Sequence, residues 1–139
     1  DRETVGLRMK QHCANAEKVV TFLETQKKVQ NVIYPTNHQG EIKERALRYM
    51  KGGYGSLVGM DVGTKENGAK FIDNLKMLYH VANIGDARSL AIHPATTTHS
   101  QLSEKELLAA GVTPGYVRLS IGIEHPDDII ADIKQALAA

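Results

Sequence analysis

The stretch of sequence that decides the fold is YVRLSIGIE, at residues 116–124. Apolar residues alternate along it with polar or small ones, which predicts a strand with Val117 and Leu119 on one face and Arg118 on the other. An arginine on a rigid strand suits a carboxylate or a phosphate, because its planar guanidinium can donate two parallel hydrogen bonds. Taken alone, the alternation favours a solvated arginine or a structural ion pair, since most exposed arginines bind nothing in particular.

The segment before this strand reads YHVANIGDARSLAIHPATTTH, at residues 79–99. It contains two short strand-like runs separated by turn residues, and the run at 116–124 follows as a third. Together the three runs place an amide, several hydroxyls and one arginine where a small anionic ligand could be held. This part of the chain is therefore the candidate binding region.

The composition indicates one domain of ordinary size, because 139 residues can bury a single core. The 17 basic and 16 acidic residues are interspersed and leave a formal charge of +1, which gives no sign of a nucleic-acid surface. The single cysteine, Cys13, excludes an internal disulfide and fits a reducing cytoplasm. No apolar run has the length of a membrane span, and no secretory signal is present, so we expect a soluble protein. Because the sequence begins with Asp1, we also expect a fragment.

Helical patterns alternate with short strand patterns along the chain. Three local signals mark helix starts: Thr64 as an N-cap, Ser103 with Glu106 as a capping box, and Pro126 in a first turn. The expected helices cover residues 4–25, 42–50, 65–78, 103 to 110, and 126 onward, and the expected strands cover 29–34, 54–62, two runs within 80–94, and 116–124.

This order predicts a two-layer α/β sandwich, in which a small, mostly antiparallel sheet carries helices on one face. The strands within 80–94 are joined too tightly for a crossover connection, which favours antiparallel pairing there. A sheet covered on one side leaves its other face free for water, a partner or another domain. The apolar side of the strand at 116–124 should meet the helices, and Arg118 should point to the uncovered face.

Other chemistries are weakly supported by the sequence. The pair His93 and His99 lacks the spacing of a metal site, so hydrogen-bonded structural histidines are favoured. Ser56 lies near glycines but lacks the spacing of a nucleophile turn, and a strand follows it. The lysines fall on polar helix faces or in loops, whereas a Schiff-base lysine needs desolvated surroundings. The residues alone thus offer an anion-binding arginine and no convincing nucleophile.

Two runs, HVANIGDARSLAIHPATTTH at residues 80–99 and VRLSIGIEHPDDII at 117–130, resemble the carboxy-terminal domain of the Cys/Met-metabolism pyridoxal-phosphate enzymes. The runs GLRM at 6–9 and VIYP at 32–35 are similar to that family's long interdomain helix and first small-domain strand. Within the family, the sequence is most similar to the O-acetylhomoserine sulfhydrylases. The resemblance covers essentially the whole chain.

The resemblance implies the small domain of a fold-type I enzyme over residues 1–139, with residues 1–28 as the interdomain helix. Arg118 matches the family arginine that grips the α-carboxylate of the amino-acid substrate. Asn83 matches a position whose side chain or backbone helps to hold that carboxylate. Thr98 lies in the segment that borders the substrate pocket and is expected to have a supporting role.

The resemblance also implies pyridoxal 5'-phosphate as the cofactor, held by an upstream domain that carries the Schiff-base lysine. No catalytic, cofactor-binding or metal-binding residue is therefore expected in this chain, which should be inactive alone. The implied full-length enzyme is a cytoplasmic homotetramer of methionine and cysteine biosynthesis. It would replace the acetate of O-acetylhomoserine with sulfide or a thiol.

Two alternatives remain open. Within the family, cystathionine γ-synthases and γ-lyases have a closely similar small domain. From a different class, a free-standing α/β module would use the uncovered sheet face to bind a ligand or a partner.

Overall fold

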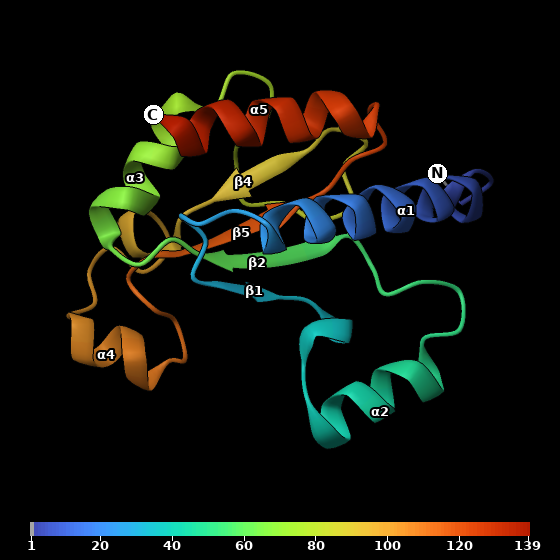
Figure 1. The fold of residues 1–139 in the computed structure, drawn as a ribbon, viewed down its shortest axis with the longest axis horizontal. Coiled ribbons are helices and arrows are strands. Elements are labelled where there is room, and N and C mark those ends of the chain that lie inside the picture. Colours follow the sequence, from blue (N-terminus) through green and yellow to red (C-terminus); the bar gives the residue numbers. More distant parts are fainter. Residues whose placement is uncertain (1) are drawn as a thin grey trace.

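The computed structural model describes residues 2–139 and contains a five-stranded sheet with one face covered by helices (Figure 1). The element order alternates helices with strands, as the sequence predicts. The helices are α1 (Val5–Glu24), α2 (Gly40–Tyr49), α3 (Lys65–Asn74), α4 (Glu104–Ala109) and α5 (Pro126–Ala138), and the strands are β1 (Asn31–Ile33), β2 (Leu57–Asp61), β3 (Tyr79–His80), β4 (Leu90–Ile92) and β5 (Tyr116–Ser120).

The strands lie in the order β1-β2-β5-β4-β3, so β5 is at the centre of the sheet. β2 and β4 flank it, and both run antiparallel to it. The expected mostly antiparallel sheet is thus confirmed. The expectation for residues 80–94 is wrong, because β3 pairs with β4 in parallel. β3 has only two residues, and the open loop at 81–89 is long enough to bring the chain back without a crossover helix.

One face of the sheet is covered by α1, α3 and α5, of which α1 and α5 lie side by side above it in Figure 1. The strand side chains that point to this layer are fully buried. Val58, Met60, Val117 and Leu119 each have 0% exposure. They pack with apolar residues of the three helices in one core. The helical layer therefore supplies most of the hydrophobic stabilisation of this domain.

The other face is poorly covered. In Figure 1, α2 lies on the side of the sheet opposite α1 and α5. Ala46 is its only buried residue, although Ile42 and Leu47 were expected to mark a buried stripe. Ile42 is 57% exposed and Leu47 is 50% exposed. The sequence thus predicts the helix correctly, but the apolar side chains of α2 have little within residues 2–139 to pack against.

The three local signals for helix starts are confirmed. The Thr64 hydroxyl accepts a hydrogen bond from the Asn67 N–H at 3.1 Å. Ser103 and Glu106 form the capping box, and Pro126 is at the start of α5. These caps satisfy N–H groups that have no partner inside a helix.

Two elements end earlier than the sequence predicts. α3 ends at Asn74 rather than near 78, because the buried Asp132 carboxylate accepts the N–H groups of residues 76–78. β5 ends at Ser120 rather than at 124. After α3, a distant side chain thus takes the N–H groups of residues 76–78. After β5, the Ser89 hydroxyl takes the Gly122 N–H, and the Ile123 N–H donates to the Ala87 carbonyl of a loop.

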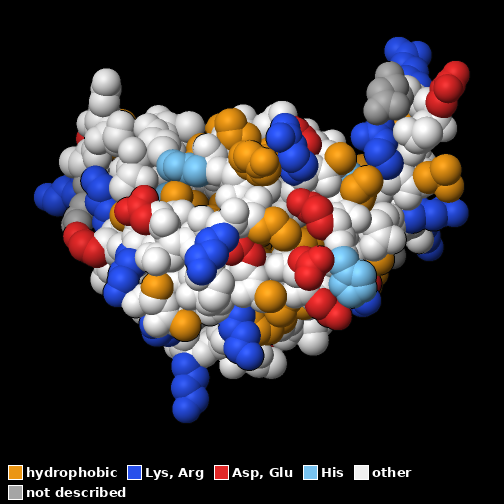
Figure 2. All heavy atoms as spheres, turned by 90° about the horizontal axis from the view of Figure 1, so that it is seen from above, with side chains coloured by type: hydrophobic (Ala, Val, Ile, Leu, Met, Phe, Trp, Pro, Cys, Tyr) orange, Lys and Arg blue, Asp and Glu red, His pale blue; other side chains and the backbone are white. Residues whose placement is uncertain are grey.

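The outer surface of the helical layer carries a mixture of charges. Figure 2 shows lysine and arginine side chains interspersed with aspartate and glutamate, with small apolar areas between them. Within residues 2–139, no helix combines the length and the apolar character needed to cross a membrane.

Candidate functional site

Arg118 lies in the middle of β5, opposite Gly59 of β2 and Ile92 of β4. Its neighbours Val117 and Leu119 point into the core, so Arg118 points to the other face of the sheet. The side chain is partly buried. Among residues 2–139, its guanidinium has neither an ion-pair nor a hydrogen-bond partner. A partly buried cation without a partner differs from the solvated or ion-paired arginine that periodicity alone favours.

Arg118 lines a hollow of about 520 Å³ between the sheet and α2. Gly59, opposite Arg118, carries no side chain, and the Tyr116 ring and Ile33 lie close above it. The remaining lining is mainly apolar and aromatic. It consists of Ile33, Tyr34, Pro35, His38, Ile42, Arg45, Ala46, Tyr49, Met50, Leu57, Val58 and Tyr116.

The charges around this hollow are unequal. Arg45 is exposed, and its guanidinium forms an ion pair with the Glu41 carboxylate at 2.6 Å. Burial raises the pKa of the Tyr116 phenol, and the nearby Arg118 charge opposes that rise only in part. Tyr34 is also neutral, because burial raises the pKa of its phenol, which donates a hydrogen bond to the Gly55 carbonyl at 2.9 Å. Arg118 is thus the cation of this hollow that has no matching anion. An anionic group with an apolar remainder suits such a site.

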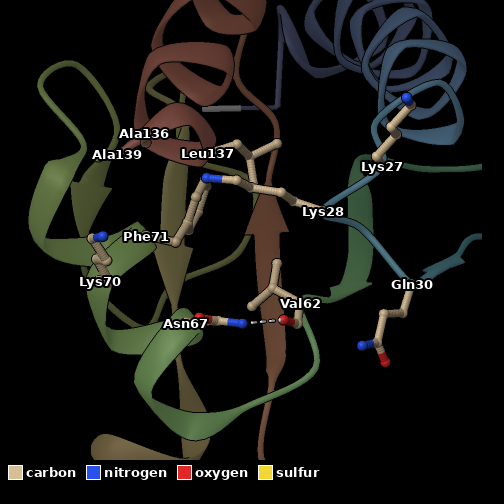
Figure 3. A pocket seen from close by; sticks show the side chains of 10 residues that line it. All are labelled: Lys27, Lys28, Gln30, Val62, Asn67, Lys70, Phe71, Ala136, Leu137 and Ala139. Atoms are coloured by element: carbon tan, nitrogen blue, oxygen red, sulfur yellow. Dashed lines mark hydrogen bonds between the residues drawn. The ribbon is translucent and has the colours of Figure 1, made fainter.

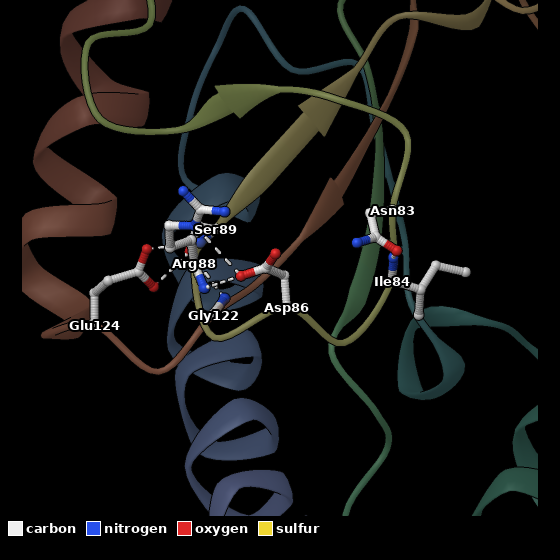
Figure 4. Close-up of polar contacts among 7 residues, drawn as sticks. All are labelled: Asn83, Ile84, Asp86, Arg88, Ser89, Gly122 and Glu124. Atoms are coloured by element: carbon white, nitrogen blue, oxygen red, sulfur yellow. Dashed lines mark hydrogen bonds and ion pairs between the residues drawn. The ribbon is translucent and has the colours of Figure 1, made fainter. Parts of the chain in front are cut away.

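Asn83 lies in the exposed loop between β3 and β4. Its side-chain oxygen accepts the N–H of Ile84 at 2.9 Å, which fixes a turn within the loop (Figure 4). Asn83 is not among the residues that line the hollow beside Arg118. Within this chain, the structure does not bring the two residues into direct contact.

Thr98 is exposed and lies in the turns after the short 3-10 helix at Pro94–Thr96. Its hydroxyl is 2.8 Å from Nδ1 of His99. Thr98 also does not line the hollow that contains Arg118. Of the three residues implied by the resemblance, Arg118 lines this hollow, and Asn83 and Thr98 do not.

A polar network that the sequence analysis missed joins the Asn83 loop to the end of β5. Glu124 accepts two hydrogen bonds from Ser89, and the Ser89 hydroxyl accepts one from the N–H of Gly122 (Figure 4). Ser89 is completely buried. A glycine and a glutamate directly after a strand are the only sequence signal for this network, and they do not identify the partner.

His93 is a structural histidine, as expected. It is 0% exposed, and its Nδ1 lies 3.0 Å from the Thr96 hydroxyl. Its Nε2 lies 2.7 Å from the Pro114 carbonyl oxygen. Burial lowers its pKa, although the Pro114 contact acts in the opposite direction. In the part of the chain that is described, no three metal-ligating side chains gather in one place.

A second hollow, of about 270 Å³, lies where the ends of α1, α3 and α5 meet (Figure 3). It contains Lys27, Lys28 and Lys70, which suggests an anion site. Figure 3 shows that Lys28 reaches toward Phe71 and Leu137, whereas Lys27 and Lys70 lie on opposite sides of the hollow. The Lys28 ammonium donates to the Ala138 carbonyl at 3.4 Å. The amide of Asn67 already donates to the Val62 carbonyl at 3.0 Å. These groups do not converge on one ligand.

The lysines bear on whether this chain could hold pyridoxal phosphate. A lysine that carries this cofactor as a Schiff base needs desolvated surroundings in which its amine is nucleophilic. Every lysine of the chain is exposed except Lys43, which lies partly buried on α2. Lys43 does not line either hollow described above. The residues present therefore do not fit the cofactor, and no chemical step through it is derived from them.

Comparisons with known proteins agree with one another. The family model for Cys/Met metabolism PLP-dependent enzymes matches residues 2–138. The chain is 48% identical over 137 residues to an O-acetyl-L-homoserine sulfhydrylase of Leptospira meyeri, covering 97% of this chain and 31% of that protein. It is 41% identical over 138 residues to an L-methionine gamma-lyase of Fusobacterium nucleatum, covering 97% of this chain and 34% of that protein.

A solved structure has the same fold over nearly the whole chain. It is that of a Campylobacter jejuni protein named as an O-acetylhomoserine (thiol)-lyase, which carries N'-pyridoxyl-lysine-5'-monophosphate. The TM-score is 0.89 at 41% identity, and the match covers 99% of this chain and 33% of that one. The chain thus spans about a third of the length of the proteins it matches.

Proposed function

Because the chain belongs to the family of Cys/Met metabolism PLP-dependent enzymes, we propose that it is the substrate-binding small domain of an O-acetylhomoserine sulfhydrylase. In this proposal the domain is carboxy-terminal, and residues 1–28 connect it to a cofactor-binding domain outside this chain. The complete enzyme is a cytoplasmic homotetramer, and the isolated domain has no activity.

The observation that carries the proposal is the state of Arg118. Its guanidinium has no partner within residues 2–139 and lies in a hollow with mainly apolar walls. A partly desolvated cation is unfavourable unless it pairs with an anion. A planar fork on a rigid central strand can hold the carboxylate of an amino acid in one orientation.

In the complete enzyme, pyridoxal phosphate held outside this chain would supply the electron sink for replacing a group at the γ-carbon of the amino acid. This chain contributes binding and orientation. Arg118 fixes the carboxylate, so the reacting carbons stay in one place relative to the rest of the site. Asn83 and Thr98 have supporting roles at the edge of the substrate site. The substrates are O-acetylhomoserine and sulfide or a thiol.

The test is substitution of Arg118 in the full-length protein. Loss of a bidentate charged contact in Arg118→Ala should raise the KM for O-acetylhomoserine about a hundredfold. Arg118→Lys keeps the charge but loses the fork, so it should recover only part of this loss. The matched control is Arg45→Ala, which removes the exposed, ion-paired arginine of the same hollow. Equal KM values for Arg118→Ala and the unsubstituted enzyme would sink the proposal.

A second candidate is a γ-lyase, or a cystathionine γ-synthase with the same small domain. The similarity to an L-methionine gamma-lyase at 41% identity favours keeping it. The two reactions are distinguished by incubating the full-length enzyme with O-acetylhomoserine in the presence and absence of sulfide. A sulfhydrylase forms homocysteine only with sulfide, whereas a lyase releases ammonia without it.

A further inference from the structure

The buried Ser89 and the partly buried Glu124 connect two segments that are distant in the sequence. The Ser89 N–H donates to one carboxylate oxygen of Glu124 at 2.6 Å. The Ser89 hydroxyl donates to the other oxygen at 2.9 Å. The same hydroxyl oxygen accepts the Gly122 N–H at 2.8 Å. All the polar groups that meet here are therefore satisfied by one another.

Gly122 allows the two segments to approach closely. A Cβ atom at this position would clash with the Glu124 carboxylate and the Ala87 carbonyl oxygen, and would lie 2.6 Å from the Arg88 carbonyl carbon. The contacts with residues 87 and 88 are to backbone, which cannot turn aside as a flexible side chain can. The backbone is held further by the Ile123 N–H, which donates to the Ala87 carbonyl at 2.9 Å. A larger residue would push the loop away from the end of β5.

The segment at residues 121–124 is itself fixed from the opposite side by α1. Nδ1 of His12 lies 2.6 Å from the Ile121 carbonyl oxygen. The Asn15 amide donates to the Gly122 carbonyl at 3.0 Å and to the Glu124 carbonyl at 2.7 Å. His12 and Asn15 are both buried. Glu124 therefore projects from a rigid base that is continuous with the strand of Arg118.

The loop that Glu124 holds has few other supports. Residues 81–85 are exposed, and Asn83 and Asp86 accept N–H groups of the same loop. Asp86 also pairs with the Arg88 guanidinium, which lies over the Tyr79 ring of β3. Figure 4 shows Asn83 at the far end of this loop from Ser89 and Glu124. The position of the loop relative to β5 thus depends largely on the contacts that Ser89 and Ala87 make with residues 122–124.

We propose that Glu124 is a positioning residue, which fixes the Asn83 loop against the strand that carries Arg118. This rests on the proposed function, because it is the amino-acid substrate that would contact both parts. Glu124 acts through hydrogen-bond geometry and does not touch the substrate.

The test uses variants of the full-length enzyme. Glu124→Met has a similar length but lacks both acceptors, so it should raise the KM for the amino-acid substrate about tenfold, because a small displacement of binding groups is costly. The KM for sulfide and kcat should stay within about twofold. Glu124→Gln can accept from the Ser89 N–H and donate to the Ser89 hydroxyl. Its KM for the amino-acid substrate should therefore be close to that of the unsubstituted enzyme.

Amide hydrogen exchange provides a readout that does not depend on activity. In Glu124→Met, exchange at residues 81–89 should accelerate about tenfold relative to the unsubstituted enzyme. The matched control is Asp132→Asn, which weakens a buried carboxylate contact to a different loop, at residues 76–78. That control should leave both the KM and the exchange of residues 81–89 unchanged.

The outcomes separate this inference from the proposed function. An unchanged KM in Arg118→Ala overturns the proposed function. A raised KM in Arg118→Ala with an unchanged KM in Glu124→Met overturns only the positioning role. The positioning role is also overturned if Asp132→Asn raises the KM as much as Glu124→Met does, or if the KM of Glu124→Gln is as high as that of Glu124→Met. If Glu124→Met does not fold, Ser89→Ala decides instead: it keeps the N–H contact and should raise the KM about threefold.

Discussion

The two faces of the sheet differ in where their side chains find partners. On the covered face, Val117 and Leu119 of β5 are 0% exposed and pack against α1, α3 and α5. On the other face, Arg118 lies between these two residues in the sequence, and its guanidinium has no partner within residues 2–139. A single strand thus contributes to a complete core on one side and to an incomplete site on the other.

Polar groups follow the same division. Asp132, in the helical layer, accepts N–H groups from three consecutive residues and the amide of Gln135. Within residues 2–139, the Arg118 side chain has no such hydrogen bonds. In the proposed function, the covered face serves stability, whereas the open face binds a ligand or meets another part of the protein. Substitutions on the covered face should therefore lower the free energy of unfolding, whereas substitutions on the open face should mainly raise the KM for the amino-acid substrate.

The largest expected effect comes from breaking the covered face. Leu119→Ala removes a fully buried side chain and should lower the free energy of unfolding by about 3–4 kcal/mol. Arg118→Ala, one residue earlier, should change it by no more than about 0.5 kcal/mol, because no hydrogen bond or ion pair within residues 2–139 is lost. Urea unfolding followed by circular dichroism measures both. Similar losses in the two variants would contradict the division of the faces.

A second, smaller effect is expected at Asp132. Asp132→Asn cannot accept all the N–H groups of residues 76–78 equally well and should cost about 2 kcal/mol. Burial disfavours the charged carboxylate, but the N–H donors outweigh burial and hold its pKa below the ordinary value.

The pH dependence of this effect has a definite sign. An aspartate in the unfolded chain has a pKa of about 3.9. Because the folded pKa is lower, the carboxylate stabilises the fold above that pH and loses this contribution as the pH falls toward the folded pKa. The stability difference between Asp132→Asn and the unsubstituted chain should therefore shrink below about pH 4. Urea unfolding of both proteins at pH 7 and at decreasing pH measures this stability difference. A difference that stays constant with pH would rule out the stabilising role of the Asp132 carboxylate.

Much of the fold was predictable because its signals are local. The alternation around Arg118 predicts which face of β5 meets the core, and Thr64, Ser103 and Pro126 each predict a helix start that is confirmed. These signals involve residues only a few positions apart. The family resemblance adds the candidate role of Arg118, which periodicity alone does not favour.

The features that could not be predicted depend on distant partners. The parallel pairing of β3 with β4 rests on the path of the loop at 81–89. The early end of α3 depends on Asp132, which is more than fifty positions away in the chain. Glu124 looks like an ordinary polar residue of an alternating strand until Ser89 is placed beside it. Side chains that replace backbone pairing leave no periodic signal in the sequence.

A small effect on stability is also expected at Gly59, on the open face directly opposite Arg118. An added Cβ would lie 2.7 Å from Cε2 of Tyr116 and 3.1 Å from Cβ of Ile33, so the Tyr116 ring must shift into the hollow. The clash and the gain in strand preference oppose each other, and Gly59→Ala should change the free energy of unfolding by less than about 1 kcal/mol. In the full-length enzyme the same variant should raise the KM for the amino-acid substrate, because the shifted ring reduces the space beside Arg118. The matched control is Gly6→Ala, where an added Cβ meets nothing within 4 Å. A large loss of stability in Gly59→Ala, with no change in KM, would contradict this prediction. Gly59 would then be needed for packing, and the variant would give no evidence that the open face binds the substrate.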